Sequence, residues 1–225
     1  PKKIAETLLG EMDLDGSYFT KCEIAGPGFM NFFLSQKFYS DVLKDVFACG
    51  ENYGKSDYGK GKKILVEFVS ANPTGPMHIG NARGGAIGDC LASVLDWAGY
   101  SVNREFYVND AGNQIEKFAT SLEVRYLQHF DSSVELPEDA YHGQDIVDHA
   151  ENFIAEYGDK YVNAQSSERR KALVDYALPK NIAGLEKDLG RYRITYDKWF
   201  RESTLHNDGS VQKVIDALKE KGVTY

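Results

Sequence analysis

The chain has 225 residues, 42% of them hydrophobic and 12% aromatic, so it can bury a core in one large domain or in one domain with a smaller unit. A formal net charge of −8 argues against a protein coated with a nucleic-acid-binding surface. Basic residues still gather in two segments, 54–63 and 166–193, which are either solvated faces or a local basic strip.

The sequence contains no apolar run of about 18 residues and no basic-then-apolar opening of the secretory type, so we expect a cytoplasmic protein without a membrane anchor. Its three cysteines, Cys22, Cys49 and Cys90, are far apart and form no Cys-x-x-Cys motif. We therefore predict reduced, structural cysteines and neither a disulfide framework nor a zinc site.

The first 50 residues predict a small α+β unit. An amphipathic run that starts abruptly at Pro1 is typical of the tail of a helix, which indicates that the chain is a fragment. Two short aromatic strands are expected on either side of Gly26-Pro27-Gly28, because this tripeptide continues neither a strand nor a helix. A helix should follow, with Ser35 as its cap and Gly50 as its stop.

A linker and an α/β pattern follow this unit. Residues 51–63, rich in glycine and lysine, have linker composition, and we place a domain boundary there. Apolar runs at 63–71 and 101–110 predict buried strands, while 79–100 and 111–130 have helical periodicity. This alternation predicts a Rossmann-like, doubly wound parallel sheet with right-handed crossovers.

From about residue 131 to 190 the pattern becomes mainly helical, as expected for an insertion into the sheet domain. Residues 194–203 return to strand character, and 209–222 predict a closing helix. The fold class is therefore α/β, with an incomplete sheet, a helical insertion and a preceding α+β unit.

The segment "VEFVSANPTGPMHIGNARGGAIGD", residues 66–89, joins the first strand of the sheet to its first helix. Prolines restrict their own φ and the residue before them, so residues 72–76 predict a rigid turn. Unpaired amides at the start of the following helix favour an anion, and Gly80 would let a flat purine or ribose approach the backbone. His78 could donate a hydrogen bond to a phosphate oxygen.

The same residues also have a purely structural explanation. A histidine at a helix start can be a cap or a packed side chain. Gly84, Gly85 and Gly88 each cost about 1 kcal/mol relative to alanine within a helix, unless close packing against a neighbouring element requires them. The combination of strand, proline turn, His-x-Gly and glycine-rich helix, in that order, favours a nucleotide site.

"ANPTGPMHIGNAR" resembles the His-Ile-Gly-His signature of class I aminoacyl-tRNA synthetases, and residues 66–115 as a whole resemble arginyl-tRNA synthetase. "EIAGPGFMNFFLS" resembles the end of the N-terminal tRNA-binding domain of that family, and "YDKWFRES" its later segment. The resemblance implies three parts: the end of the tRNA-binding domain at 1–50, a linker at 51–63, and a partial catalytic domain at 64–225 with its insertion at about 131–190.

The resemblance also implies ligands and site residues. ATP with Mg²⁺, L-arginine and tRNA(Arg) would be bound by a monomer that forms arginyl-adenylate and then transfers arginine to the tRNA. Catalytic roles would fall to His78 and Asn81. ATP would be contacted by Pro73, Thr74, Gly75, His78, Gly80 and Asn81. Arginine would be contacted by Glu67, Ser70, Ala71, Asn72, Asn81, Asp110 and Gln114. No metal ligand is expected among the side chains.

Several alternatives remain open from the residues alone. Glu67 could be a strand residue paired to a lysine, and Asp110 a helix cap. Asn81 replaces the final histidine of the signature, so it can form hydrogen bonds but carries no charge. The family's lysine-bearing loop and helical anticodon-binding domain are not found in these 225 residues, so the chain should be inactive alone. Competing functions are a smaller His-x-Gly nucleotidyltransferase and a noncatalytic RNA-binding module descended from a synthetase.

Overall fold

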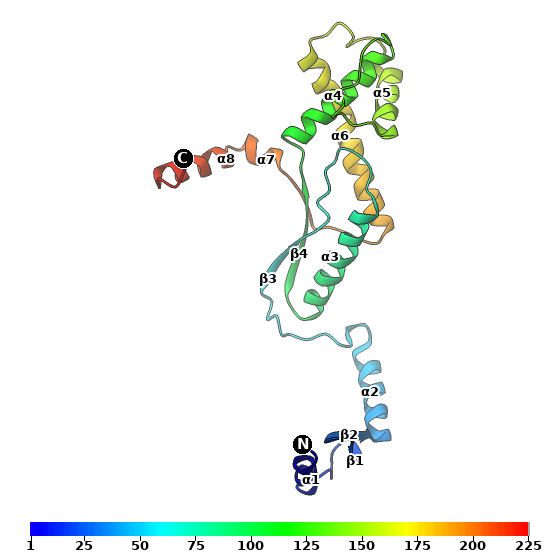
Figure 1. Cartoon of the computed structure of the whole chain (residues 1–225), viewed down its shortest axis with the longest axis vertical. Helices are drawn as coiled ribbons and strands as arrows, with labels where there is room; N and C mark the ends of the chain where they lie inside the picture. Colours follow the sequence, from blue (N-terminus) through cyan, green and yellow to red (C-terminus); the bar gives the residue numbers. More distant parts are fainter. Residues whose placement is uncertain (225) are drawn as a thin grey trace. The chain divides into compact units, whose positions relative to one another are not determined.

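The computed structural model describes residues 1–224, which form two compact units, Pro1–Lys55 and a second unit that begins at Ser56 (Figure 1). Among these residues, no helix combines the length and the apolar character needed to cross a bilayer. The elements of the first unit are α1 (Lys2–Gly10), β1 (Phe19–Ala25), β2 (Phe29–Leu34), α2 (Gln36–Cys49) and the 3₁₀ helix η1 (Gly50–Asn52).

In the first unit, β1 and β2 pair as an antiparallel hairpin in which Cys22 lies opposite Phe32. The hairpin turn requires Gly28, because its φ is +133° and a Cβ there would lie 2.8 Å from the carbonyl carbon of Pro1. Ser35 stands at the N-cap of α2, but its hydroxyl makes no capping bond and is buried without a partner among the described residues. The predicted side-chain cap is therefore wrong, although the helix begins where expected.

The second unit is built on a parallel sheet of strand order β3-β4-β5. Its elements are β3 (Lys63–Glu67), α3 (Ile79–Trp97), β4 (Ser101–Val108), α4 (Asn113–Gln128), α5 (Gln144–Tyr157), α6 (Ser166–Arg191), β5 (Lys198–Arg201), α7 (Ser203–Asn207) and α8 (Ser210–Glu220). The predicted α/β class with a parallel sheet is confirmed, and the three strands correspond to part of a Rossmann-like fold.

Two hydrophobic cores hold the second unit together, and α6 contributes to both. The sheet core includes Phe68 and Phe106 together with Leu185 and Leu189 from the C-terminal half of α6. The helical core joins α4, α5 and the N-terminal half of α6 through Phe118, Leu122, Tyr126, Ile146, Phe153, Leu173 and Ala177. Because one 26-residue helix enters both cores, it fixes the helical region relative to the sheet.

Two glycines of α3, Gly85 and Gly88, allow close packing. A Cβ on Gly88 would overlap the ring of Phe68, and one on Gly85 would lie 2.8 Å from Ile194 Cδ1. Gly84 has no such neighbour within 4 Å. The helix therefore approaches the sheet closely along Gly85 and Gly88, which supports the structural explanation for these two residues.

Candidate active site

The turn after β3 contains two residues with left-handed backbone conformations. Val69 has φ +67° and Ser70 has φ +42°, a region that a β-branched residue such as valine rarely adopts. The strain is held by contacts with the sheet, because Ser70 Oγ accepts a hydrogen bond from the Tyr107 N–H of β4 at 3.1 Å. The turn is therefore anchored to the carboxyl end of the neighbouring strand.

The proline turn that follows is braced from α6. Pro73 is buried, and its carbonyl oxygen accepts a hydrogen bond from Asn181 Nδ2 at 3.0 Å. Asn181 Oδ1 lies 2.6 Å from Nε2 of His149, a residue of α5. A chain of two hydrogen bonds thus connects the turn to α6 and, through it, to α5.

His78 is the N-cap of α3. Its Nδ1 accepts a hydrogen bond from the Gly80 N–H at 3.1 Å, and its own N–H donates to Asn81 Oδ1 at 3.0 Å, which completes a capping box. The N–H groups of Asn81 and Ala82 both donate to the His78 carbonyl. The prediction of unpaired amides at this helix start is therefore wrong for these three residues, because the helix satisfies them itself.

The capping hydrogen bond also determines the tautomer of the neutral imidazole. Because Nδ1 accepts, a neutral ring carries its proton on Nε2, which leaves Nε2 as the donor available to a ligand. His78 is exposed and lines two cavities.

The larger of these cavities has a volume of about 500 Å³, a size typical of small-molecule sites. One wall includes seven predicted site residues, beside Val69 and Pro76: Ser70, Ala71, Asn72, Thr74, Gly75, His78 and Asn81. The opposite wall is formed by Tyr141, Gly143 and Asp145, which lead into α5. A Cβ on Gly75 would lie 3.3 Å from the Asp145 carboxylate, so the two walls meet closely.

The remaining predicted site residues lie outside this cavity. Pro73 is buried behind the turn, and Gly80 faces solvent at the helix start. Gln114 lies behind the wall, where its Oε1 accepts a hydrogen bond from the Tyr141 hydroxyl. Glu67 is exposed at the end of β3, and no lysine or arginine pairs with it among residues 1–224. The alternative in which Glu67 pairs with a lysine is therefore not observed among the described residues, and its contact with arginine stays a prediction.

Asp110 acts as a cap in this structure. Both its carboxylate oxygens accept hydrogen bonds from Ser203, one from the N–H and one from the hydroxyl, each at 2.8 Å. Arg201 Nη1 lies 3.8 Å away. The carboxylate thus stabilises the start of α7, as the helix-cap alternative for this residue predicts.

An acidic group surrounds Tyr107 at the carboxyl edge of the sheet. Burial raises the pKa of the Tyr107 hydroxyl above its ordinary value, and the negative charges of Glu202, Glu67 and Asp110 raise it further. These three carboxylates follow or end β5, β3 and β4. Because parallel strands present their carboxyl ends at one edge, residues distant in the sequence create a local negative potential there.

The sequence patterns missed the residues that the helical region contributes to this site, namely Tyr141, Gly143, Asp145, His149 and Asn181. Each lies between 68 and 108 positions after Pro73 in the sequence. No local periodicity relates such distant segments. The only available signal was the polar run "YHGQD" before α5, which looked like an ordinary helix start.

Comparisons with known proteins decide the family. The model for "tRNA synthetases class I (R), catalytic domain" matches residues 43–224, and that for "Arginyl tRNA synthetase N terminal domain" matches residues 1–34. The chain belongs to the arginyl-tRNA synthetase family. The resemblance inferred from the His78-x-Gly80 segment is therefore confirmed.

Relatives in the arginyl-tRNA synthetase family match the whole chain. Arginine–tRNA ligases from Caldanaerobacter subterraneus subsp. tengcongensis and Acetivibrio thermocellus are 58% and 56% identical to it over its full length. The chain spans 40% of the length of each of these curated relatives.

Solved structures agree. A crystal structure from Campylobacter jejuni, provisionally described as an arginyl-tRNA synthetase, is similar with a TM-score of 0.72 and 32% identity over 83% of this chain and 40% of that one. Thermus thermophilus arginyl-tRNA synthetase, at 23% identity, covers 98% of this chain and 35% of its own with a TM-score of 0.59, and this likeness concerns the fold alone.

Proposed function

We propose that the chain is the N-terminal part of an arginine–tRNA ligase, which activates L-arginine with ATP and transfers it to tRNA(Arg). The observation that carries the proposal is the cavity between the proline turn, the capped start of α3 and Asp145. Seven residues expected to contact ATP or arginine line that one cavity. Family membership supports the reaction, and the cavity supports the proposed location of the ATP site.

In this proposal, ATP occupies the cavity and His78 contacts its α-phosphate. The Nε2–H of the neutral ring can donate to a phosphate oxygen while Nδ1 remains engaged by the Gly80 N–H. Asn81 supports this geometry through its bond to the His78 backbone. Charge that develops on the phosphate oxygens as the arginine carboxylate attacks would be stabilised by this donor.

The acidic edge around Tyr107 favours a cationic substrate. Glu67 is exposed there and would attract the positive charge of arginine, while Ser70, Ala71 and Asn72 would position the reacting end. Asp110 contributes negative potential, although Ser203 occupies both its oxygens. Because Gln114 lies behind Tyr141, we propose that it acts on the ligand through that hydroxyl.

Magnesium would enter with the triphosphate. The phosphate oxygens would supply ligands for it, as is usual for Mg²⁺ bound with a nucleotide. The cytoplasmic location, the monomeric state and the boundaries at 50, 63, 131 and 190 are parts of the same proposal.

The test is arginine-dependent ATP–pyrophosphate exchange by the natural protein that contains this chain, with and without tRNA(Arg), beside calorimetric titration of ATP. We expect exchange with arginine and none with lysine. Absence of any heat with ATP would favour a noncatalytic RNA-binding module instead. Adenylyl transfer to an acceptor other than an amino acid would favour the smaller nucleotidyltransferase.

A further inference from the structure

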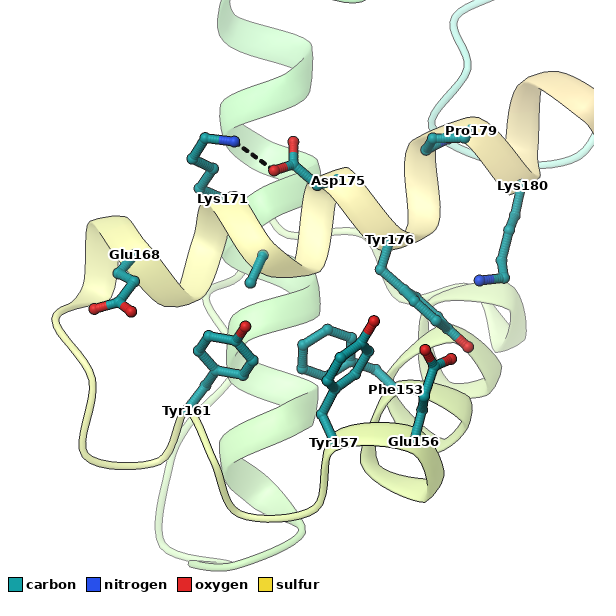
Figure 2. Close-up of a pocket in the computed structure, with 11 residues that line it drawn as sticks. Phe153, Glu156, Tyr157, Tyr161, Glu168, Lys171, Asp175, Tyr176, Pro179 and Lys180 are labelled. Carbon is teal, nitrogen blue, oxygen red and sulfur yellow. Dashed lines mark hydrogen bonds and ion pairs between the residues drawn. The ribbon is translucent and has the colours of Figure 1, made fainter.

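A second cavity, of about 570 Å³, lies between α5, the segment after it and α6 (Figure 2), and shares no lining residue with the proposed ATP cavity. Four aromatic rings line it: Phe153, Tyr157, Tyr161 and Tyr176. Phe153 is buried at its base, with ring centroids 4.6 Å from Tyr157, 5.6 Å from Tyr161 and 5.3 Å from Tyr176. We call this set the tyrosine pocket.

Two lysines lie over these rings. Lys180 Nζ is 3.2 Å from the centroid of Tyr176, and Lys160 Nζ is 5.0 Å from that of Tyr161. Within residues 1–224 neither ammonium group has a carboxylate within 4.0 Å. The tyrosine pocket is therefore flanked by cations whose charge is not neutralised by an ion pair.

A further positive group adjoins the pocket along α6. Arg169 and Arg170 both bind the single carboxylate of Glu123, so the cluster has one positive charge in excess. Arg170 and Lys171 line a neighbouring cavity of about 500 Å³, and Lys171 borders the tyrosine pocket as well. This is the basic segment 166–193 of the sequence, which the proposed ATP site leaves unexplained.

The pocket also presents hydrogen-bond acceptors. Asp175 is paired with Lys171 and Glu156 interacts with the Tyr157 hydroxyl, whereas Glu168 lines the cavity without a lysine or arginine partner among the described residues. Aromatic faces bind flat bases by stacking, cations bind phosphates, and carboxylates accept hydrogen bonds from base amino groups. A ligand that combines all three features is a nucleotide whose base carries an exocyclic amino group.

We propose that the tyrosine pocket binds an unpaired adenine or cytosine base of RNA, with flanking phosphates on Lys160, Lys180 and Arg170. The base stacks on Tyr157, and Glu156 or Glu168 accepts from its amino group. The inference rests on the proposed function in naming RNA, because tRNA is the macromolecular substrate of that reaction. It adds a contact on the helical region that is separate from the ATP cavity.

The test measures fluorescence anisotropy of labelled oligo(A), oligo(C) and oligo(U) RNAs of about eight nucleotides, within the usual site size for single strands. Oligo(A) and oligo(C) should bind more tightly than oligo(U). Tyr157→Ala should weaken binding roughly 5- to 100-fold, as expected for loss of one stacked base. Lys180→Gln should lower the slope of log K against log salt by about 0.7.

Matched controls separate the pocket from general effects. Tyr58→Ala removes a tyrosine that is 79% exposed and lines none of these cavities, and Lys187→Gln removes an exposed lysine of α6. Both should leave affinity unchanged. Equal affinity of the Tyr157→Ala and Tyr58→Ala variants, or equal binding of all three RNAs, would overturn the inference.

Calorimetric titration of ATP into the same variants keeps the two proposals distinguishable. Tyr157→Ala should bind ATP like the unsubstituted chain, since the tyrosine pocket and the ATP cavity share no residue. RNA binding that depends on Tyr157 in a chain that fails to bind ATP would support the tyrosine pocket and count against the proposed function. Normal ATP binding with an RNA affinity that does not depend on Tyr157 would overturn the tyrosine pocket and support the proposed function.

Discussion

Asn181 and Pro73 are 108 positions apart, yet the side-chain amide of one donates to the backbone carbonyl of the other at 3.0 Å. Pro73 is buried and belongs to the turn that lines the proposed ATP cavity. A movement of the turn would therefore break this bond. The same asparagine contacts His149 at 2.6 Å. Asn181 therefore positions the turn from a helix that belongs to both hydrophobic cores.

Replacing Asn181 by leucine should loosen that turn. The buried Pro73 carbonyl would lose its donor, which destabilises the fold by about 1–3 kcal/mol. We expect faster amide hydrogen exchange in residues 69–78 and weaker ATP binding. Asn163→Leu, at an exposed position after α5, is the matched control and should change neither quantity. Unchanged exchange in the turn of the Asn181 variant would show that the bond does not brace it.

His78 has two separable roles, as a helix cap and as the proposed contact to phosphate. His78→Ala removes both, and should lower the free energy of unfolding by about 1 kcal/mol through loss of the cap. It should also slow adenylate formation in the natural full-length protein, because about 2–4 kcal/mol of transition-state stabilisation would be lost.

His78→Asn distinguishes the two roles, because asparagine is among the best N-cap residues but lacks the imidazole. Chemical denaturation should give nearly the original stability, while pyrophosphate exchange remains as slow as in the alanine variant. Recovery of the exchange rate together with stability would restrict His78 to capping.

The sequence predicted what depends on local patterns. The strands near Val66 and Phe106 follow from apolar runs, and their parallel pairing follows from the intervening helical period of α3. The rigid turn at Pro73 follows from the restricted φ of proline. These features need only neighbouring residues, which is why they could be predicted without coordinates.

Contacts between distant segments could not be predicted in the same way. Nothing near Pro73 indicates that Asn181 binds its carbonyl, and nothing near Asp110 indicates that Ser203 occupies its carboxylate. His78 illustrates a different difficulty, since the same residue type suits a cap and a phosphate contact. The geometry shows the cap, and the phosphate contact stays a prediction.

The buried Glu123 cluster should make stability depend on pH. Burial by itself raises the pKa of the Glu123 carboxyl, but hydrogen bonds from Arg170, Ser166 and Arg169 outweigh it and hold the pKa below its ordinary value. A carboxyl with a lowered folded-state pKa stabilises the fold above its unfolded pKa, about 4.3, and this stability is lost as the pH falls through the folded value.

Glu123→Gln should therefore destabilise the chain at neutral pH, by about 3 kcal/mol or more, because two arginines lose their buried partner charge. Its free energy of unfolding should also fall less than that of the unsubstituted chain as the pH drops below about 4.3. Denaturant titrations at a series of pH values measure both effects, with exposed Glu135→Gln as the control. Parallel pH profiles for the Glu123 variant and the unsubstituted chain would contradict the assignment.

Alanine substitutions at two glycines of α3, Gly84 and Gly88, should change the free energy of unfolding in opposite directions. A methyl group at Gly88 would overlap the Phe68 ring, which is only 8% exposed and packs against Tyr196 with a centroid distance of 4.7 Å. Because the ring has little room to move, Gly88→Ala should destabilise the fold by about 1–3 kcal/mol. A Cβ added at Gly84 would have no neighbour within 4 Å, so Gly84→Ala should stabilise the helix by about 0.5–1 kcal/mol. Urea unfolding of the two variants measures both shifts, and a shift of the same sign at Gly84 and Gly88 would mean that α3 does not approach the sheet along Gly88.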